Sequence, residues 1–206
     1  YSGAAFSSVE AKFNNVQLCE VEENVEALMV ANHLDSDSGF IYYHYWFSGA
    51  HAPENHKVMF QSLENMLRDG EPNLPFALSW ANEPWTKRWT GIDAGSQETL
   101  LSQEYGDKSE WEDHFTYLLQ FFTHPNYIKV DGGKPVFIIY RIGHIGSHLE
   151  PMLALWRKMA IENGLPGIHF VNTVGNFRFI DNQTAVLEKR ASIDAAFHFW
   201  PQLLGS

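Results

Sequence analysis

The chain has 206 residues, of which 45% are hydrophobic and 19% charged, so it has the composition of a folded globular domain and not of a disordered segment. Its 25 acidic and 14 basic residues give a net charge of -11, which disfavours binding to nucleic acid. The single cysteine, Cys19, excludes an intramolecular disulfide and a zinc site made of cysteines.

The spacing of apolar residues predicts strands that alternate with helices. The expected strands are residues 40–47, 74–80, 134–141, 168–174 and 194–200. Helical spacing is found in residues 9–34, 59–67, 111–122 and 152–159, and residues 177–190 are expected to form an irregular loop with a short helix.

Several residues are expected to begin or end these helices. Ser109 with Glu112, and Ser147 with Glu150, have the spacing of a capping box, in which each side chain hydrogen-bonds the other's backbone amide. Gly70 and Gly164 follow helical segments and are expected to end them.

The strict strand–helix order, with strands that are apolar on both faces, predicts an α/β fold with a parallel sheet. This sheet could be open and doubly wound or part of a barrel. A glycine-rich phosphate loop, common in open nucleotide-binding sheets, follows none of the strands, and this favours the barrel. Because five strands do not close a barrel, we expect residues 1–206 to form one domain, a partial (β/α)8 TIM-type barrel that is a fragment or a truncated copy of a longer one.

Polar and aromatic residues gather where nearly every predicted strand ends, and in a barrel these ends meet at one mouth. Aromatic residues make up 15% of the chain, and their flat rings suit the apolar face of a sugar, although a core rich in tryptophan is the alternative. The candidate sugar-binding residues are Tyr42, His44, Trp46, Trp80, Asn82, Trp85, Tyr140, Arg141, Asn172 and His198.

Some of these assignments have specific alternatives. Tyr42 and His44 share one face of their strand, opposite Tyr43 and Tyr45, and whichever pair faces the mouth could bind sugar hydroxyls. For His44 and His198 the alternative is a buried core histidine. Arg141 could clamp a carboxylate or phosphate, or form a surface salt bridge.

Glu83 is the candidate catalytic residue. It follows an apolar strand between Trp80 and Trp85, and apolar surroundings disfavour the charged carboxylate, as a general acid requires. The neighbouring Asn82 could hold a substrate hydroxyl. The alternative for Glu83 is a structural ion pair with Lys87 or Arg88.

The sequence predicts no metal site, because it contains neither a His-Glu-x-x-His motif nor a calcium-binding loop. No cofactor is expected, apart from a nucleotide-sugar donor if the protein is a transferase. We also expect no transmembrane segment, and the absence of a signal peptide favours a cytoplasmic location.

Three segments resemble the WbsX-type glycosyltransferase family: G-F-I-Y-Y-H-Y-W-F-S-G at 39–49, P-F-A-L-S-W-A-N-E-P-W-T-K-R-W at 75–89, and residues 111–141. The resemblance extends over about residues 39–201. It implies a role in the synthesis of surface polysaccharide, and a barrel similar to that of glycoside hydrolase family 99, the endo-α-mannosidases.

The chain also departs from the family pattern. It lacks the opening Gly-Phe-Thr-Glu-Trp-type motif and the later Asn-Glu-Trp-x-Glu-Gly motif, whose glutamates resemble the catalytic pair of the hydrolases. The Asn-Trp that usually follows the family glutamate is Pro84-Trp85 here. The resemblance therefore implies that Glu83 lies at the rim of an active site, and that the main catalytic pair lies outside this chain.

Two functions remain open from the sequence. The first is a carbohydrate-active enzyme that makes or cleaves glycosidic bonds in an oligosaccharide or polysaccharide. The second is a carbohydrate-binding protein without catalysis, or an inactive truncated barrel. A structural or partner-binding barrel fragment, which would bind no sugar, is a third hypothesis.

Overall fold

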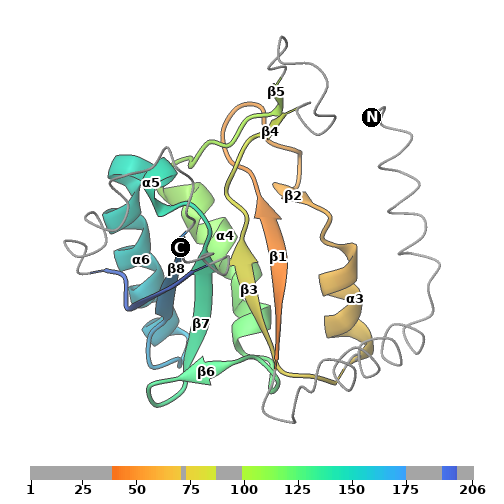
Figure 1. The fold of residues 1–206 in the computed structure, drawn as a ribbon, viewed down its shortest axis with the longest axis vertical. Coiled ribbons are helices and arrows are strands. Elements are labelled where there is room, and N and C mark those ends of the chain that lie inside the picture. Colours follow the sequence, from red (N-terminus) through yellow and green to blue (C-terminus); the bar gives the residue numbers. More distant parts are fainter. Residues whose placement is uncertain (1–38, 71–72, 87–98, 175–191, 199–206) are drawn as a thin grey trace, which may run out of the picture.

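The computed structural model describes residues 39–70, 73–86, 99–174 and 192–198 of the chain. The helix expected in residues 9–34 and the loop expected in 177–190 lie outside these ranges. Five parallel strands form the central sheet (Figure 1): β1 (Phe40–Trp46), β3 (Phe76–Trp80), β7 (Lys134–Ile139), β8 (His169–Val174) and β9 (Ala195–His198).

Helices connect the parallel strands, and short strands flank them. The helices are α3 (Gln61–Asp69), α4 (Lys108–Phe122), α5 (Ile142–Ile145) and α6 (Leu149–Glu162), with a 3-10 turn at Gly146–His148. The short strands β2 (Lys57–Val58) and β6 (Lys129–Val130) pair antiparallel with β1 and β7, and β4 (Trp85–Thr86) pairs with β5 (Thr99–Leu101) in a separate ribbon.

The five parallel strands lie side by side in the order in which they occur in the sequence, β1-β3-β7-β8-β9. This confirms the predicted α/β fold with a largely parallel sheet. The four short strands were not predicted, because strands of two or three residues are too short for apolar alternation to reveal them.

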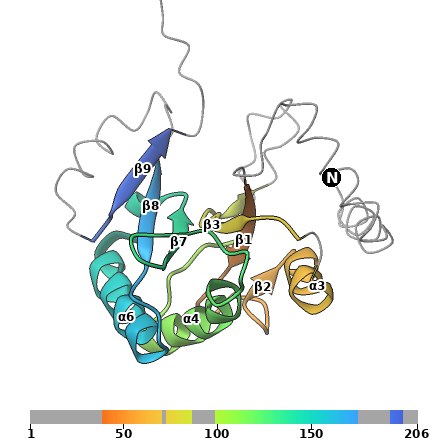
Figure 2. The same cartoon turned by 90° about the horizontal axis from the view of Figure 1, so that it is seen from below.

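The helices α3, α4 and α6 lie along one side of the sheet (Figure 2). Large apolar side chains fill the space between the helices and the strands, among them Trp80, Phe115, Phe137, Trp156 and Phe170. Burying a side chain of this size contributes about 1.5–3 kcal/mol to folding. On the opposite face of the sheet, Ile41 and Tyr43 are 53% and 42% exposed. The sheet therefore has one face covered by helices. The other face, which we call the open face, is exposed at β1, whereas Ala77, Ser79 and Ile138 of the inner strands are buried on it.

Helix α4 begins two residues earlier than expected. Asp107 is its N-cap, and Oδ1 of this residue accepts hydrogen bonds from the amides of Ser109 and Glu110, at 2.8 Å and 3.3 Å. The Glu110 carboxylate in turn accepts from the Asp107 amide at 3.1 Å. The capping box is thus Asp107 with Glu110, and the prediction of Ser109 with Glu112 was wrong.

Helix α6 has no capping box. Its N-cap is His148, which makes no side-chain hydrogen bond to the helix. The chain is already helical through α5 and the 3-10 turn, so α6 lacks the free first turn that a Ser147–Glu150 box would cap. Glu150 instead accepts a hydrogen bond from the hydroxyl of Ser192 at 2.8 Å. By contrast, Gly70 ends α3 as predicted, in the left-handed conformation with φ 74°.

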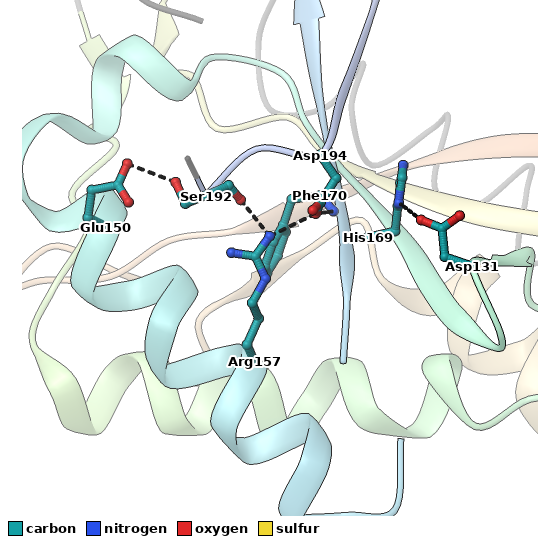
Figure 3. A network of polar contacts seen from close by, with 7 residues as sticks. All are labelled: Asp131, Glu150, Arg157, His169, Phe170, Ser192 and Asp194. Atoms are coloured by element: carbon teal, nitrogen blue, oxygen red, sulfur yellow. Dashed lines mark hydrogen bonds and ion pairs between the residues drawn. The ribbon is translucent and has the colours of Figure 1, made fainter. Parts of the chain in front are cut away.

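Arg157 ties α6 to the segments around β8 and β9 (Figure 3). Its guanidinium donates to the Ser192 carbonyl at 2.7 Å and pairs with Asp194 Oδ2 at 2.8 Å. The same Asp194 oxygen accepts a hydrogen bond from the backbone amide of Phe170. The centre of the Phe170 ring lies 4.9 Å from the guanidinium carbon of Arg157. These contacts lie where β8 and β9 begin, at the amino edge of the sheet. This edge is opposite the strand ends where the sequence predicts the sugar-binding residues.

Candidate functional site

Three neighbouring strands end together at the carboxyl edge of the sheet. His44 of β1 pairs with Trp80 of β3, and Trp80 pairs with Ile139 of β7. The segments that leave β3 and β7 therefore run next to each other. This brings together Glu83 and Arg141, which are far apart in the sequence.

Glu83 and Arg141 form an ion pair, with 2.5 Å between Arg141 Nε and Glu83 Oε1. The Arg141 side chain is 14% exposed and the Glu83 side chain 37% exposed. Lys87 and Arg88, the partners considered from the sequence, lie outside the described residues. The immediate partner of Glu83 is thus a guanidinium, not the purely apolar surroundings expected for a general acid.

Asn82 holds this arrangement in place. Its side-chain oxygen accepts from the Arg141 amide at 2.8 Å, and its side-chain nitrogen donates to the Arg141 carbonyl at 2.9 Å. The same nitrogen lies 3.1 Å from the hydroxyl of Tyr105. Asn82 is fully buried, so its amide joins two loops and is not presented to a substrate hydroxyl as the sequence interpretation proposed.

Aromatic rings from three segments lie beside the ion pair. The rings of Tyr43 and Tyr140 meet edge to face with 6.4 Å between their centroids. Tyr45 lies 6.5 Å from Tyr43 and 5.4 Å from Trp85, again measured between ring centroids. We call Glu83, Arg141, Tyr43, Tyr45, Tyr140 and Trp85 the rim cluster.

The tyrosines near Glu83 remain protonated at neutral pH. Burial, followed by the charges of neighbouring groups including Glu83, raises the pKa of Tyr43. The pKa of Tyr140 is raised mainly by burial and by Glu83, while Arg141 opposes the increase. Burial raises the pKa of Tyr105 to about 12, and Glu83 adds to it. Neutral phenols can both donate and accept hydrogen bonds.

His144 also lies within electrostatic reach of the ion pair. Burial and the positive charge of Arg141 lower its pKa, and the negative charge of Glu83 acts in the opposite direction. At neutral pH the ring is therefore uncharged, and one of its nitrogens is able to accept a proton.

The other predicted residues of β1 lie on the helix-covered face. His44 is 1% exposed, and its Nε2 lies 2.8 Å from Nε2 of His114 in α4. Burial lowers the pKa of His44 to about 3, with Lys57 adding to the effect. The pKa of His114 is also lowered by burial. Both rings are neutral, so one donates the hydrogen bond between them and the other accepts it. His44 thus lies in the core of the fold.

Tyr42, Trp46 and Trp80 lie on the same covered face. Tyr42 packs edge to face on Phe76, with 6.2 Å between ring centroids. Trp46 and Trp80 are 4% and 2% exposed, and the Trp80 indole donates to the Trp46 carbonyl at 3.2 Å. The structure does not bring these three residues to the open face, because alternation along β1 turns Tyr43 and Tyr45 there instead.

Asn172 and His198 lie on the strands farther from the ion pair. Asn172 is fully buried on the face that it shares with its neighbour Ile139, and within the described part of the chain its amide has no hydrogen-bond partner. His198 closes β9 opposite Val174, and its side chain lies outside the described part.

Two residues near the ion pair, Tyr105 and His144, were absent from the sequence-based candidates, and Tyr43 with Tyr45 entered only as the alternative to Tyr42 with His44. Both faces of β1 carry aromatic residues, so polarity alone could not show which face was open. Tyr105 lies in the connection between β5 and α4, and His144 in the four-residue helix α5, which is too short for a periodic pattern to mark it.

The described residues contain no group of three or more histidine, cysteine or acidic side chains that could hold a metal ion. Among the helices in these same ranges, none has the length and apolar character required to cross a bilayer.

Comparison with known proteins gives a family match over most of the chain. The sequence model described as "Glycosyltransferase WbsX" matches residues 8–205. Two curated relatives, each called "Uncharacterized protein WxcX", come from Xanthomonas campestris pv. campestris, strains B100 and ATCC 33913. Each is 28% identical over 136 residues, which are 66% of this chain and 18% of the relative. The matched region thus spans less than a fifth of those relatives. No solved structure matches the chain.

Proposed function

This chain belongs to the glycosyltransferase WbsX family, and from that premise we propose that it forms part of a carbohydrate-active enzyme that makes or cleaves glycosidic bonds in a polysaccharide. The single observation that carries the proposal is the rim cluster. It combines a partly exposed carboxylate with aromatic rings at the carboxyl edge of a parallel sheet.

The chemistry of the rim cluster suits a sugar. Tyrosine and tryptophan rings can pack against the apolar face of a pyranose, and a carboxylate accepts hydrogen bonds from its hydroxyls. In parallel α/β folds, binding sites form at the carboxyl ends of the strands, where the rim cluster lies.

We further propose that residues 1–206 form a single domain, a partial barrel of the (β/α)8 type. The sequential order of the parallel strands supports this, as does the placement of α3, α4 and α6 on one side (Figure 2). In such a barrel the open face of the sheet would be the interior and the carboxyl edge its mouth.

Glu83 is the proposed catalytic residue of this part of the enzyme. Paired with Arg141, it is suited to act as a base: it can take the proton from an attacking hydroxyl while the bond from the sugar's anomeric carbon to its leaving group breaks. A hydrolase requires a second carboxyl group, about 5–9.5 Å away depending on stereochemistry. A transferase would require a nucleotide-sugar donor.

A carbohydrate-binding protein without catalysis is the second candidate. The ion pair favours it, because a carboxylate already held by a guanidinium can serve purely as a hydrogen-bond acceptor. This candidate predicts sugar binding without turnover, and binding that persists in Glu83→Gln.

Product analysis separates these functions. The protein would be incubated with a nucleotide-sugar and an acceptor oligosaccharide, and separately with the oligosaccharide alone. Extension of the acceptor identifies a transferase, and new reducing ends identify a hydrolase. The Glu83→Gln variant should lose about 10²–10⁴-fold of either activity. Glu162→Gln, which removes the same charge at the end of α6, should retain it. Sugar binding without either product would leave only the binding function.

A further inference from the structure

Arg141 is more enclosed than the carboxylate it binds. Its side chain is 14% exposed against 37% for Glu83, and its guanidinium carbon lies 5.1 Å from the centre of the Tyr140 ring. A ligand that approaches the rim cluster therefore meets the carboxylate before it meets the guanidinium. This argues against Arg141 as a clamp for a substrate carboxylate or phosphate.

The backbone on both sides of the ion pair is also held in place. The preceding residue, Asn82, is fully buried and bonded at both ends of its amide to the Arg141 backbone. The Glu83 amide itself donates to the Ala81 carbonyl at 2.9 Å. Both the glutamate and the arginine are thus fixed at the backbone, and an incoming anion would have to break their pair.

From this geometry we infer that the rim cluster selects a neutral, hydroxyl-bearing sugar and rejects a uronate of the same ring. The inference rests on the proposed function and names the substrate class of the same site. Arg141 is then an internal counter-ion that positions Glu83, and the exposed part of the Glu83 carboxylate accepts hydrogen bonds from sugar hydroxyls.

The surroundings of the Glu83–Arg141 ion pair also favour a neutral sugar over an anionic one. Burial, and to a smaller extent the negative charge of Glu83, raises the pKa of Tyr43, Tyr140 and Tyr105, so these phenols are neutral. The neutral phenols provide donors and acceptors that suit hydroxyl groups. The net charge of -11 repels anions at longer range.

Isothermal titration can test the inference with matched pairs of ligands. The probes are the methyl glycosides of glucose, galactose and mannose, each measured beside a uronate of the same ring, such as glucuronate or galacturonate. We expect at least one neutral glycoside to bind about tenfold or more tightly than its uronate, since like charges at an interface are strongly unfavourable. Raising the salt concentration should reduce this difference.

Glu83→Gln is isosteric and removes the charge, so it should narrow the preference for the neutral sugar severalfold, chiefly by strengthening uronate binding. Glu162→Gln changes the net charge equally at the opposite edge and should leave the preference intact. The inference is overturned if the wild type binds a uronate as tightly as its neutral partner, or if both variants change the preference equally. If the folded protein binds none of these sugars, the proposed function fails together with the inference.

Discussion

The side-chain amide of Asn82 holds the backbone of Arg141 at both its donor and its acceptor, with bonds of 2.8 Å and 2.9 Å. These bonds join the loops after β3 and β7, and they set Glu83 beside the Arg141 guanidinium. The residue that the sequence suggested as a sugar ligand is therefore the support on which the rim cluster is built.

Replacing Asn82 should destabilise the protein and disturb the rim cluster. Asn82→Ala leaves the buried Arg141 amide and carbonyl without these partners, which should lower the free energy of unfolding by about 2–3 kcal/mol in urea denaturation. Asn126→Ala, which removes the hydrogen bond to Asn73 near the surface, is the control and should cost less than about 0.5 kcal/mol.

Asn82→Asp is a sharper version of this test. Aspartate can still accept from the Arg141 amide, but it cannot donate to the Arg141 carbonyl, and it adds a negative charge next to Glu83. We expect this variant to be at least as unstable as Asn82→Ala. A stability equal to that of the wild type would show that the bond to the Arg141 carbonyl is unimportant.

Adjacent tyrosines on opposite faces of β1 should behave differently. Tyr42 packs on Phe76, so Tyr42→Ala should cost roughly 1–3 kcal/mol of stability. Tyr43 is 42% exposed in the rim cluster, so Tyr43→Ala should cost less stability and weaken sugar binding by about tenfold, as loss of an aromatic contact does. Urea denaturation and titration calorimetry on both variants check this. Weaker binding in Tyr42→Ala alone would place the site on the other face.

The contrast within β1 shows where sequence reasoning reached its limit. The strands, their parallel arrangement and the edge that carries Glu83 and Arg141 all followed from apolar runs and from the residues at the strand ends. The open face of β1 did not, because Tyr42 and Tyr43 are the same residue type. Only the packing of α4, which brings His114 against His44, distinguishes the two faces.

The ion pair could not be predicted for a related reason. Arg141 and Glu83 were each identified at the end of a strand, but their pairing depends on which strands are neighbours and how their loops turn. Local sequence suggested Lys87 or Arg88 instead. The capping error at α4 is smaller, since Asp107 with Glu110 has the same spacing as the pair that was chosen.

Acid should destabilise the protein through the buried histidine pair. The pKa of His44 is about 3 in the folded state and 6.5 in the unfolded chain, so the unfolded chain binds more protons between these values. Stability should therefore be greatest above about pH 6.5 and fall by several kcal/mol as the pH decreases towards the folded-state pKa of His44. His114, whose pKa is also lowered, should add to the decrease.

His114→Gln tests this assignment. Glutamine can still hydrogen-bond His44, but it removes one of the two titrating rings, so stability should depend less steeply on pH between 6.5 and 4. Urea denaturation across this range measures the slope. His51→Gln, at an exposed loop residue, is the control for the substitution itself. An unchanged slope in His114→Gln would mean that other groups cause the acid sensitivity.

The network around Arg157 should support the fold without affecting sugar binding. Arg157→Met removes the bonds to the Ser192 carbonyl and to Asp194, and should lower stability by about 1–3 kcal/mol (Figure 3). Sugar affinity should not change, because this network lies at the opposite edge of the sheet. Arg68→Met, which removes an exposed pair with Asp69, should unfold at the same urea concentration as the wild type. A loss of sugar affinity in folded Arg157→Met would contradict this separation.

The central claim, that carbohydrate binds at the rim cluster on the open face, is tested most directly by NMR of the tyrosine rings. The protein, labelled on its tyrosine rings, would be titrated with whichever methyl glycoside of glucose, galactose or mannose binds most tightly. We predict that the ring signals of Tyr43, Tyr45 and Tyr140 shift together with one affinity, while those of Tyr42 and the buried Tyr127 do not move. Shifts confined to Tyr42 or Tyr127, or saturable binding that moves none of the three rim tyrosines, would contradict the claim.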